Sequence, residues 1–542
     1  MHRLDKIFAI GGFLLGSMLV ADNLPAADLL PVERSIAETV DHYIGLKLQA
    51  AKIEPTAEAT APNLIRRLTL DLVGRIPTAA EARKYSNSTD ADKRNILVDR
   101  LIASDAFVRH QANEFDAFLM TGTNASVRDY LLTAFQSRRG WNDMFRDMLI
   151  ADQTSEFKSA IEFVKRRIRD TDKLANDVSV VFFGVNVSCA KCHDHPLVPD
   201  WTQDHFYGMK SFFSRTFQNG DFVGERDYGV VKFRTIAGEE RLARPMFLTG
   251  RIIDEPEAPK LSAEEKKQEK AELERLKKDK KPPPPPKFSR RAKLAEIALQ
   301  SPDNEYFSRA IVNRIWYRLF GHGLVMPLDQ MHPRNEPSHP LLMEWLARDL
   351  VDHDYDLTRL IRGMVMSEVY SRTSLWWADN RPTPDLFAVA SVRPLTPYQY
   401  ASALRLASSS PVRFSDNVSA EVTASRLESL ENSARGLAGK FEQPGEDFQV
   451  SVTEALLLSN SEAVTNELLR DSGDSLVGVL KKMKDSQTVV ETAVWNVLSR
   501  APTDDERKIL GDFYTRHGDD RLKASQQLVW SLLTSSELRF NY

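Results

Sequence analysis

Residues 256 to 291 form a stretch with almost no large apolar side chain, and it contains five consecutive prolines, Pro282 to Pro286. Such a composition cannot bury enough apolar surface to join a hydrophobic core. The middle of the stretch is rich in Glu, Lys, Ala and Leu, which favours a solvated helix, whereas the prolines favour a stiff extended rod of roughly 15 Å. We therefore expect a charged, proline-rich linker at 256–291 that joins an N-terminal domain, residues 30–250, to a C-terminal domain, residues 292–542.

Both expected domains contain the sequence signals that mark the ends of helices. Capping boxes, in which a Ser or Thr and a Glu or Gln three residues later satisfy each other's backbone N–H groups, begin at Thr78, Thr396, Ser451 and Thr503. Apolar residues recur at helical spacing in 95–108 and 306–320, and Gly321 can end the second of these helices in a left-handed conformation. The sequence predicts a mainly α protein with two helical domains.

The signal for β-structure is weak. Residues 229–236 and 245–253 are the best strand candidates because they are rich in β-branched and aromatic side chains. We expect them to pair as a minor β hairpin or small sheet beside the helices.

Composition limits the classes of function. The formal net charge is −4 and the pI is near 6.3, so no general basic surface indicates nucleic acid as a partner. Two cysteines cannot make a disulfide-rich scaffold. The sequence contains no G-x-S-x-G, P-loop, dinucleotide fingerprint or H-E-x-x-H pattern, so enzymatic activity is left open.

The first residues have the layout of a secretory signal peptide. Arg3 and Lys6 precede an apolar run from Ile7 to Val20, and small residues follow near Ala26. The run is short for a membrane span, which needs about 20 residues. We predict a signal peptide at 1–27 and an exported protein in the periplasm or cell envelope, with an uncleaved N-terminal anchor as the alternative. No membrane span is expected in the mature chain.

Both cysteines lie in one short motif, Cys189-Ala-Lys-Cys192-His193. This C-x-x-C-H spacing is the attachment pattern of c-type haem. Two thiols three residues apart can each add to one vinyl group of a single porphyrin, and the next residue brings an imidazole under the iron. The motif therefore predicts haem c bound through Cys189, Cys192 and His193.

Two other chemistries are open at the same motif. The segment also contains His195, so Cys189, Cys192, His193 and His195 supply ligands suited to zinc or iron, with His193 and His195 as the metal-binding imidazoles. Alternatively, the two cysteines form a local disulfide, structural or redox-active.

If haem is bound, a sixth ligand comes from nearby in the sequence or the sixth position is open. His205 and Met209 lie four residues apart and share one face if this segment is helical. A methionine ligand would raise the reduction potential and a histidine would lower it.

The residues around the motif resemble a known family. The segment 182–215 places Gly184, then C-x-x-C-H-D-H-P, then Trp201 and a Phe-Phe pair at 212–213. This order is similar to the signature of the planctomycete cytochrome-C-like proteins, which pair two domains of unknown function. His205 stands where that family usually has an aromatic residue.

Segments on either side extend the resemblance. Residues 64–81 and 97–110 are similar to the N-terminal domain of that family, and residues 313 onward, beginning NRIWYRLFGHGLV, are similar to its partner domain. The resemblance implies export in a bacterium with planctomycete-like cell architecture. It leaves the activity open, because the family's own function is largely unassigned.

A second group of polar and aromatic residues lies beside Gly and Pro turns in the expected C-terminal domain. A functional interpretation makes it a pocket for a carbohydrate, and a structural one makes it capped helix ends with a tryptophan in the core, which we favour. The group is Asn313, Arg314, Trp316, His322, Asn335 and His339.

These features predict an exported c-type cytochrome-like protein. It would transfer electrons to or from a redox partner protein, or couple haem to oxidation of a substrate in the cell envelope. The alternative is a non-redox exported scaffold or binding protein, in which the cysteine pair is a disulfide or metal staple. Its partner would be a carbohydrate or another component of the cell envelope.

Overall fold

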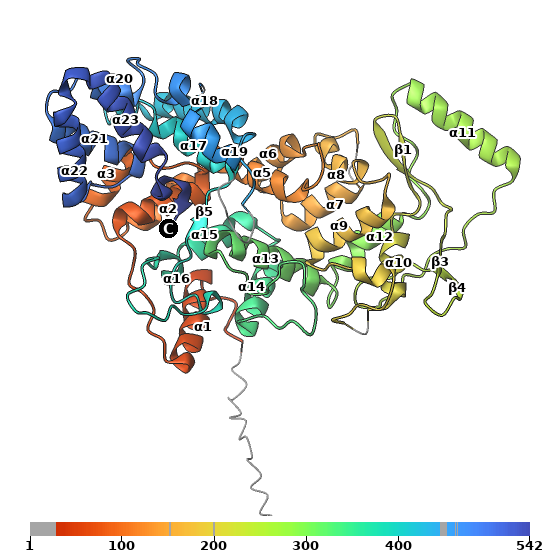
Figure 1. Ribbon diagram of the computed structural model, residues 1–542. Helices are drawn as coiled ribbons and strands as arrows, with labels where there is room; N and C mark the ends of the chain where they lie inside the picture. The colour runs from red at the N-terminus through yellow and green to blue at the C-terminus, as the bar shows by residue number, and fades with distance from the viewer. Residues whose placement is uncertain (1–28, 151–152, 199–200, 445–451, 461, 463) are drawn as a thin grey trace, which may run out of the picture.

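The computed structural model describes residues 29–150, 153–198, 201–444, 452–460, 462 and 464–542. The predicted signal peptide at 1–27 lies outside the described residues. The prediction of a mainly α protein is confirmed, because helices form nearly all of the regular structure and the strands are short (Figure 1).

Ten α-helices precede the expected linker in the residues that the structure describes, and a further helix lies within it. They are α1 (Ile36–Ala51), α2 (Ala61–Val73), α3 (Ala79–Asn87), α4 (Lys93–Ile102), α5 (Asp105–Leu119), α6 (Arg128–Gln136), α7 (Trp141–Ile150), α8 (Glu162–Lys165), α9 (Thr171–Phe183), α10 (Gln203–Ser211) and, in the linker, α11 (Ala263–Lys278).

The described helices after the linker run to the end of the chain. They are α12 (Arg290–Ala298), α13 (Asn304–Phe320), α14 (Pro340–Asp352), α15 (Leu357–Val365), α16 (Glu368–Ser371), α17 (Pro397–Ala407), α18 (Ala420–Ala438), α19 (Val452–Asn460), α20 (Leu476–Leu480), α21 (Ser486–Leu498), α22 (Asp504–Arg516), α23 (Arg521–Leu533) and α24 (Ser536–Arg539). Short 3-10 turns are η1 (Lys158–Ile161), η2 (Ser188–Lys191), η3 (Pro384–Leu386), η4 (Pro411–Phe414) and η6 (Gly518–Asp520), and η5 (Val464–Leu468) is π-helical.

The predicted helix starts agree with the structure where it describes them. Thr78, Thr396 and Thr503 each cap a helix through a complete capping box. Ser451 lies outside the described residues. Gly321 ends α13 with a φ of 77°, the left-handed conformation expected of it.

The strands in the described part of the chain form three antiparallel pairs. β1 (Thr216–Asn219) pairs with β2 (Phe222–Glu225), β3 (Val231–Arg234) with β4 (Glu240–Ala243), and β5 (Arg393–Pro394) with β6 (Phe540–Asn541).

The predicted pairing of 229–236 with 245–253 is wrong. The first segment contains β3, but its partner is β4, which follows a tight turn. The second segment folds back on itself through one bridge between Met246 and Ile252, because Gly250 turns the chain with a φ of 82°. Since β4 follows β3 after only five residues, it pairs with β3 in place of the more distant segment.

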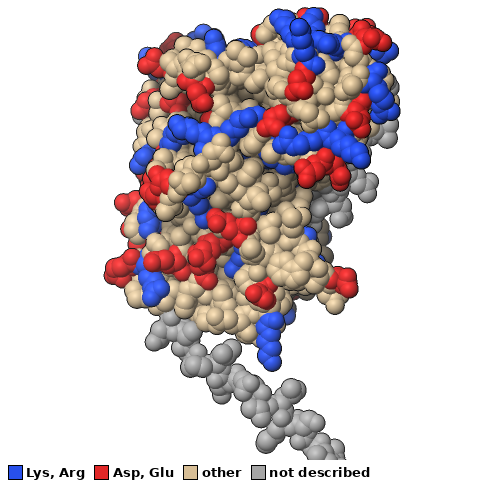
Figure 2. Space-filling model, turned by 90° about the vertical axis from the view of Figure 1, so that its left-hand side faces the viewer, with Lys and Arg blue, Asp and Glu red and all other residues tan. Residues whose placement is uncertain are grey.

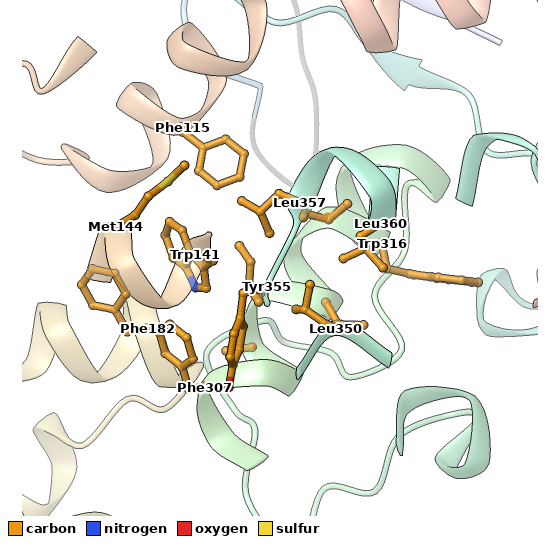
Figure 3. Packing of buried hydrophobic residues seen from close by; sticks show 14 of the residues in the cluster. Phe115, Trp141, Met144, Phe182, Phe307, Trp316, Leu350, Tyr355, Leu357 and Leu360 are labelled. Atoms are coloured by element: carbon orange, nitrogen blue, oxygen red, sulfur yellow. The ribbon is translucent and has the colours of Figure 1, made fainter. Parts of the chain in front are cut away.

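One hydrophobic core takes side chains from both sides of the linker. Trp141 of α7 lies between Phe115 of α5, Phe182 of α9 and Phe307 of α13, with ring centroids 5.5 to 6.1 Å from its own (Figure 3). The buried cluster to which they belong runs from Ile36 to Ala388. The expected boundary at 256–291 therefore does not separate two cores.

A second core also crosses the expected boundary. It gathers α17, α18, α20, α21 and α23 around Leu70 and Ile76, which come from the N-terminal part of the chain. Helix α2 therefore contributes to both cores, since its Leu68 and Leu72 belong to the first. The end of the chain packs on the same helix, where Arg66 donates to the Leu538 carbonyl and Arg67 to the Tyr542 carbonyl (Figure 1).

The linker leaves the body of the protein and returns to the same place. Helix α11 projects beyond β1 and buries none of its residues (Figure 1). It is held by Glu269, which accepts from Arg226 and Tyr228. At the base of this excursion, Glu255 and Arg290 form a bidentate ion pair with N–O distances of 2.6 and 2.8 Å.

Basic and acidic side chains are interspersed on the face that Figure 2 shows, and neither sign covers it. None of the described helices combines the length and the hydropathy that crossing a bilayer requires.

Candidate functional site

The predicted motif lies on the loop between α9 and α10, and Gly184 sets the direction of this loop. Gly184 ends α9 with a φ of 65°, a conformation that glycine adopts without strain. A Cβ atom there would approach Met331 Cβ to 3.3 Å and Ala310 Cβ to 3.4 Å. The glycine thus allows the loop to pack directly on the segment that follows α13.

A short backbone pairing joins these two segments. The Met331 N–H donates to the Gly184 carbonyl at 2.9 Å, and Val185 and Gln330 form an antiparallel bridge. The loop is therefore held by residues that lie more than a hundred positions away in the sequence.

Asn186 is the central residue of this attachment. Its backbone N–H donates to the Asp329 carbonyl at 2.8 Å, and its side-chain amide donates to the Asp329 carboxylate at 3.1 Å. Its Oδ1 accepts from the Ser188 N–H at 3.1 Å and the Ser188 hydroxyl at 2.6 Å. One side chain thus connects the remote segment to the first residue of η2.

The turn η2 carries the first cysteine, and the second follows it. Cys189 and Cys192 are both exposed, and both thiols are free. Between them, Ala190 is fully buried and anchors the turn. The Cys192 N–H points back to the Cys189 carbonyl at 3.4 Å, so both cysteines belong to one tight turn of the backbone.

The charge between the cysteines is neutralised locally. Lys191 forms an ion pair with Asp172 of α9 at 2.8 Å, and Lys210 of α10 binds the other oxygen of the same carboxylate. Partial burial raises the pKa of Asp172, but hydrogen bonds to the two lysines lower it more, so the net shift is downward. Gln203 also donates to the Lys191 carbonyl.

His193 is exposed and its ring orientation is defined. Nδ1 lies 2.7 Å from the Asp194 carbonyl oxygen, which can only accept, so Nδ1 carries the proton. A neutral imidazole protonated on Nδ1 keeps the lone pair of Nε2 for a metal.

His195 is buried and belongs to an aromatic cluster. Its ring packs edge-on against Trp201 at 5.5 Å and lies 6.2 Å from the ring of His332. Its Nδ1 accepts from the Leu197 N–H. Burial lowers the pKa of His195, and burial together with the nearby His195 lowers that of His332. Both imidazoles are therefore predominantly neutral at pH 7.

The two residues proposed as distal ligands lie on the helix that packs beside the cysteine turn, where Gln203 of α10 donates to the Lys191 carbonyl. His205 and Met209 do share helix α10, as the spacing predicts. His205 lies in the first turn, where Nδ1 accepts from the Thr202 N–H, and Met209 is completely buried in the core. Whether His205 or Met209 acts as a sixth ligand stays a prediction.

The donor set of the motif fits covalent haem. Two free, exposed thiols on one turn and an imidazole with an available Nε2 are the groups that attachment requires. In the part of the chain that the structure describes, no three or more His, Cys, Asp or Glu side chains form a group that could hold a metal ion.

The second predicted group is mostly structural. Asn313 exchanges two hydrogen bonds with the backbone of Val325, and Trp316 is fully buried against Phe320. Burial lowers the pKa of His339 to about 3. Asn335 of this group lines a pocket of about 330 Å³ beside the start of α13.

Sequence reasoning missed Asn186, Asp329 and His332 as parts of this site. Only Asn186 carries a local signal, since an Asn two residues before a Ser in a turn often accepts from that residue's N–H. Asp329 and His332 become neighbours of the motif only through the packing of α13 on α9.

We expect Asn186→Ala to lower the free energy of unfolding by about 1–2 kcal/mol, because it removes the bonds to Asp329 and Ser188. Amide hydrogen exchange should quicken in residues 185–195 more than elsewhere. The control Asn95→Ala removes a bond to the exposed Asp92 and should change stability by less than about 0.5 kcal/mol. Equal effects of the two variants would contradict the role of Asn186.

Comparison with known families gives two matches. Residues 39–218 match a family model described as a protein of unknown function (DUF1549), and residues 290–435 match another described as a protein of unknown function (DUF1553). Neither a curated protein nor a solved structure matches the chain significantly. The contact between Asn186 and Asp329 joins the two matched segments. The chain therefore carries two paired domains of unknown function, DUF1549 ahead of DUF1553.

Proposed function

We propose that this protein is an exported c-type cytochrome-like protein of the cell envelope. Cys189 and Cys192 would hold haem c covalently, and His193 would bind its iron. Electrons would pass between this haem and a redox partner protein that docks on the surface carrying the motif.

The observation that carries the proposal is the combination of two free, exposed thiols with the orientation of His193. Covalent attachment needs both sulfurs as thiols, because each S–H adds across one vinyl group and nothing leaves. The bond from Nδ1 to the Asp194 carbonyl fixes the tautomer that leaves Nε2 available.

The chain's own residues would position and tune the group. The Asn186–Asp329 contact fixes the turn that carries the thiols, and Asp172 forms an ion pair with Lys191, the residue before Cys192. When bound, haem supplies one-electron transfer at its iron. Because both cysteines are exposed, a redox partner could approach the residues that would hold the haem. His205 or Met209 of α10 would supply a sixth ligand, or the sixth position would be open.

The test is the visible spectrum and the intact mass of protein made in a host that matures c-type cytochromes. We expect a Soret band, sharp α and β bands on reduction, and a mass increased by one haem that survives denaturation. The variant C189S/C192S should lose the bands and the added mass together.

Lys191→Ala is the matched control, because it changes the residue between the cysteines and keeps their spacing. It should retain the added mass. A colourless protein whose mass is two hydrogens lower would contradict the proposal and indicate a disulfide, which favours the non-redox scaffold. A protein that gains the mass of a metal ion would contradict it as well.

A further inference from the structure

A pocket of about 330 Å³ opens beside the motif loop, between the start of α13 and the loop that follows it. Met331 forms part of its wall and donates to the Gly184 carbonyl, and His332 in the same wall packs against Trp201. The pocket is lined by Glu305, Tyr306, Arg309, Val325, Met331, His332, Pro333, Asn335, Glu336, Pro337 and Met343. It therefore shares a wall with the candidate haem site, and all of its lining residues belong to the DUF1553 segment.

Two of its polar side chains are fixed by bonds to the backbone. Nδ1 of His332 accepts from the Arg334 N–H at 3.3 Å, so the neutral ring carries its proton on Nε2 and is a donor there. Both N–H groups of the Asn335 amide are used, on the carbonyls of Met326 and Gln330 at 3.1 and 2.9 Å. The Oδ1 of Asn335 is thereby oriented as an acceptor.

The remaining polar groups continue this mixture of donors and acceptors. Burial raises the pKa of Tyr306 to about 12, so its hydroxyl keeps the proton and can both donate and accept. Arg309 and Glu305 form an ion pair at 3.2 Å, and Glu336 is an exposed carboxylate. The formal charges of the lining nearly cancel, so charge alone selects neither an anion nor a strong cation.

The apolar part of the lining is a separate surface. Val325, Met331 and Met343 are buried, and Pro333 and Pro337 flank the opening. A ligand that matches both parts has hydroxyl groups around its edge and C–H groups on its face. The volume is near the lower end of the range for small-molecule sites, which suits one ring rather than a large cofactor.

We propose that this pocket binds a neutral polyhydroxylated ring, namely one sugar unit, either free or at the end of a glycan. The inference goes beyond the redox role and stands whether or not haem is attached. It places the ligand within one layer of side chains of the motif loop, because Met331 and His332 separate the two.

The test is saturation-transfer NMR and calorimetric titration of the full chain, with and without haem. The probes are D-glucose, D-galactose, D-mannose, D-xylose, L-fucose, cellobiose, maltose and lactose. We expect at least one of them to bind. Binding of a monosaccharide indicates a free sugar as the ligand, and binding restricted to a disaccharide indicates a glycan end. No binding by any of the eight would overturn the proposal, even if the haem spectrum is present.

Tyr306→Phe removes one hydroxyl and keeps the ring that packs near Phe247. It should weaken binding about 3- to 10-fold, the value of one hydrogen bond. Tyr228→Phe is the matched control, because Tyr228 lies between β2 and β3, outside the pocket. It should leave binding unchanged. Equal affinity of the wild type and Tyr306→Phe would contradict the assignment of this pocket. A second variant, Glu336→Gln, tests the same assignment at an exposed residue of the lining.

Discussion

Asp71→Asn is expected to lower the free energy of unfolding by about 3–5 kcal/mol, because it leaves a buried guanidinium without a counter-charge. Asp71 of α2 is 5% exposed and binds Arg393 through both oxygens at 3.1 and 2.8 Å. It also accepts from the hydroxyl of Tyr370 and from the amide of Asn541. The carboxylate thus ties α2 to three segments that are distant in the sequence.

The measurement is urea unfolding followed by far-UV circular dichroism. Asp99→Asn is the control, since Asp99 pairs with Arg362 at an exposed site. This variant should lower the free energy of unfolding by less than about 1 kcal/mol. The double variant D71N/R393M should lose less than the two single losses added together, because it removes both charges of the pair. A loss below about 1 kcal/mol for Asp71→Asn would show that solvent reaches this pair.

Trp141→Ala should also cost about 3–5 kcal/mol, because it opens a cavity in a core that cannot collapse around it. Trp141 is fully buried, and its ring is stacked with that of Phe307 at an interplanar angle of 13°. Since Phe307 belongs to α13 and Trp141 to α7, both matched domains should lose stability together. Proteolysis should therefore cleave segments before and after residue 250 at lower urea concentrations than in the wild type.

Trp377→Ala is the matched control for this change. Trp377 is 65% exposed, so the same truncation there should alter stability by less than about 0.5 kcal/mol. If Trp141→Ala destabilised only segments before residue 250, the shared core would not be a cooperative unit.

The helices and their ends could be predicted because their signals are local. A capping box such as Thr503 to Glu506 specifies its own hydrogen bonds within one turn, whatever packs on it. The same kind of signal was available for the hairpin of β1 and β2, which turns through Gly220 and Asp221 with Gly220 at a φ of 64°. A Gly-Asp pair between two short segments with aromatic residues could have identified it.

Only the part of the site that consists of neighbouring residues in the sequence could be predicted. The spacing of Cys189, Cys192 and His193 indicates which groups act together, and the structure places all three on one exposed turn. What holds them is long-range: Asp329 lies 143 residues from Asn186. The sharing of one core by both domains is also hidden, because a linker composition reports only that a segment is solvated.

The ion pair between Glu255 and Arg290 has a consequence for how this chain can vary. The linker that contains α11 starts and ends at this ion pair. The number of residues in the linker can therefore change without moving the helices that it connects. Doubling the length of such a loop raises the entropic free-energy cost of closing it by only about 0.6 kcal/mol. We therefore expect changes of length in this segment, including an inserted affinity tag or fluorescent reporter, to leave both cores intact.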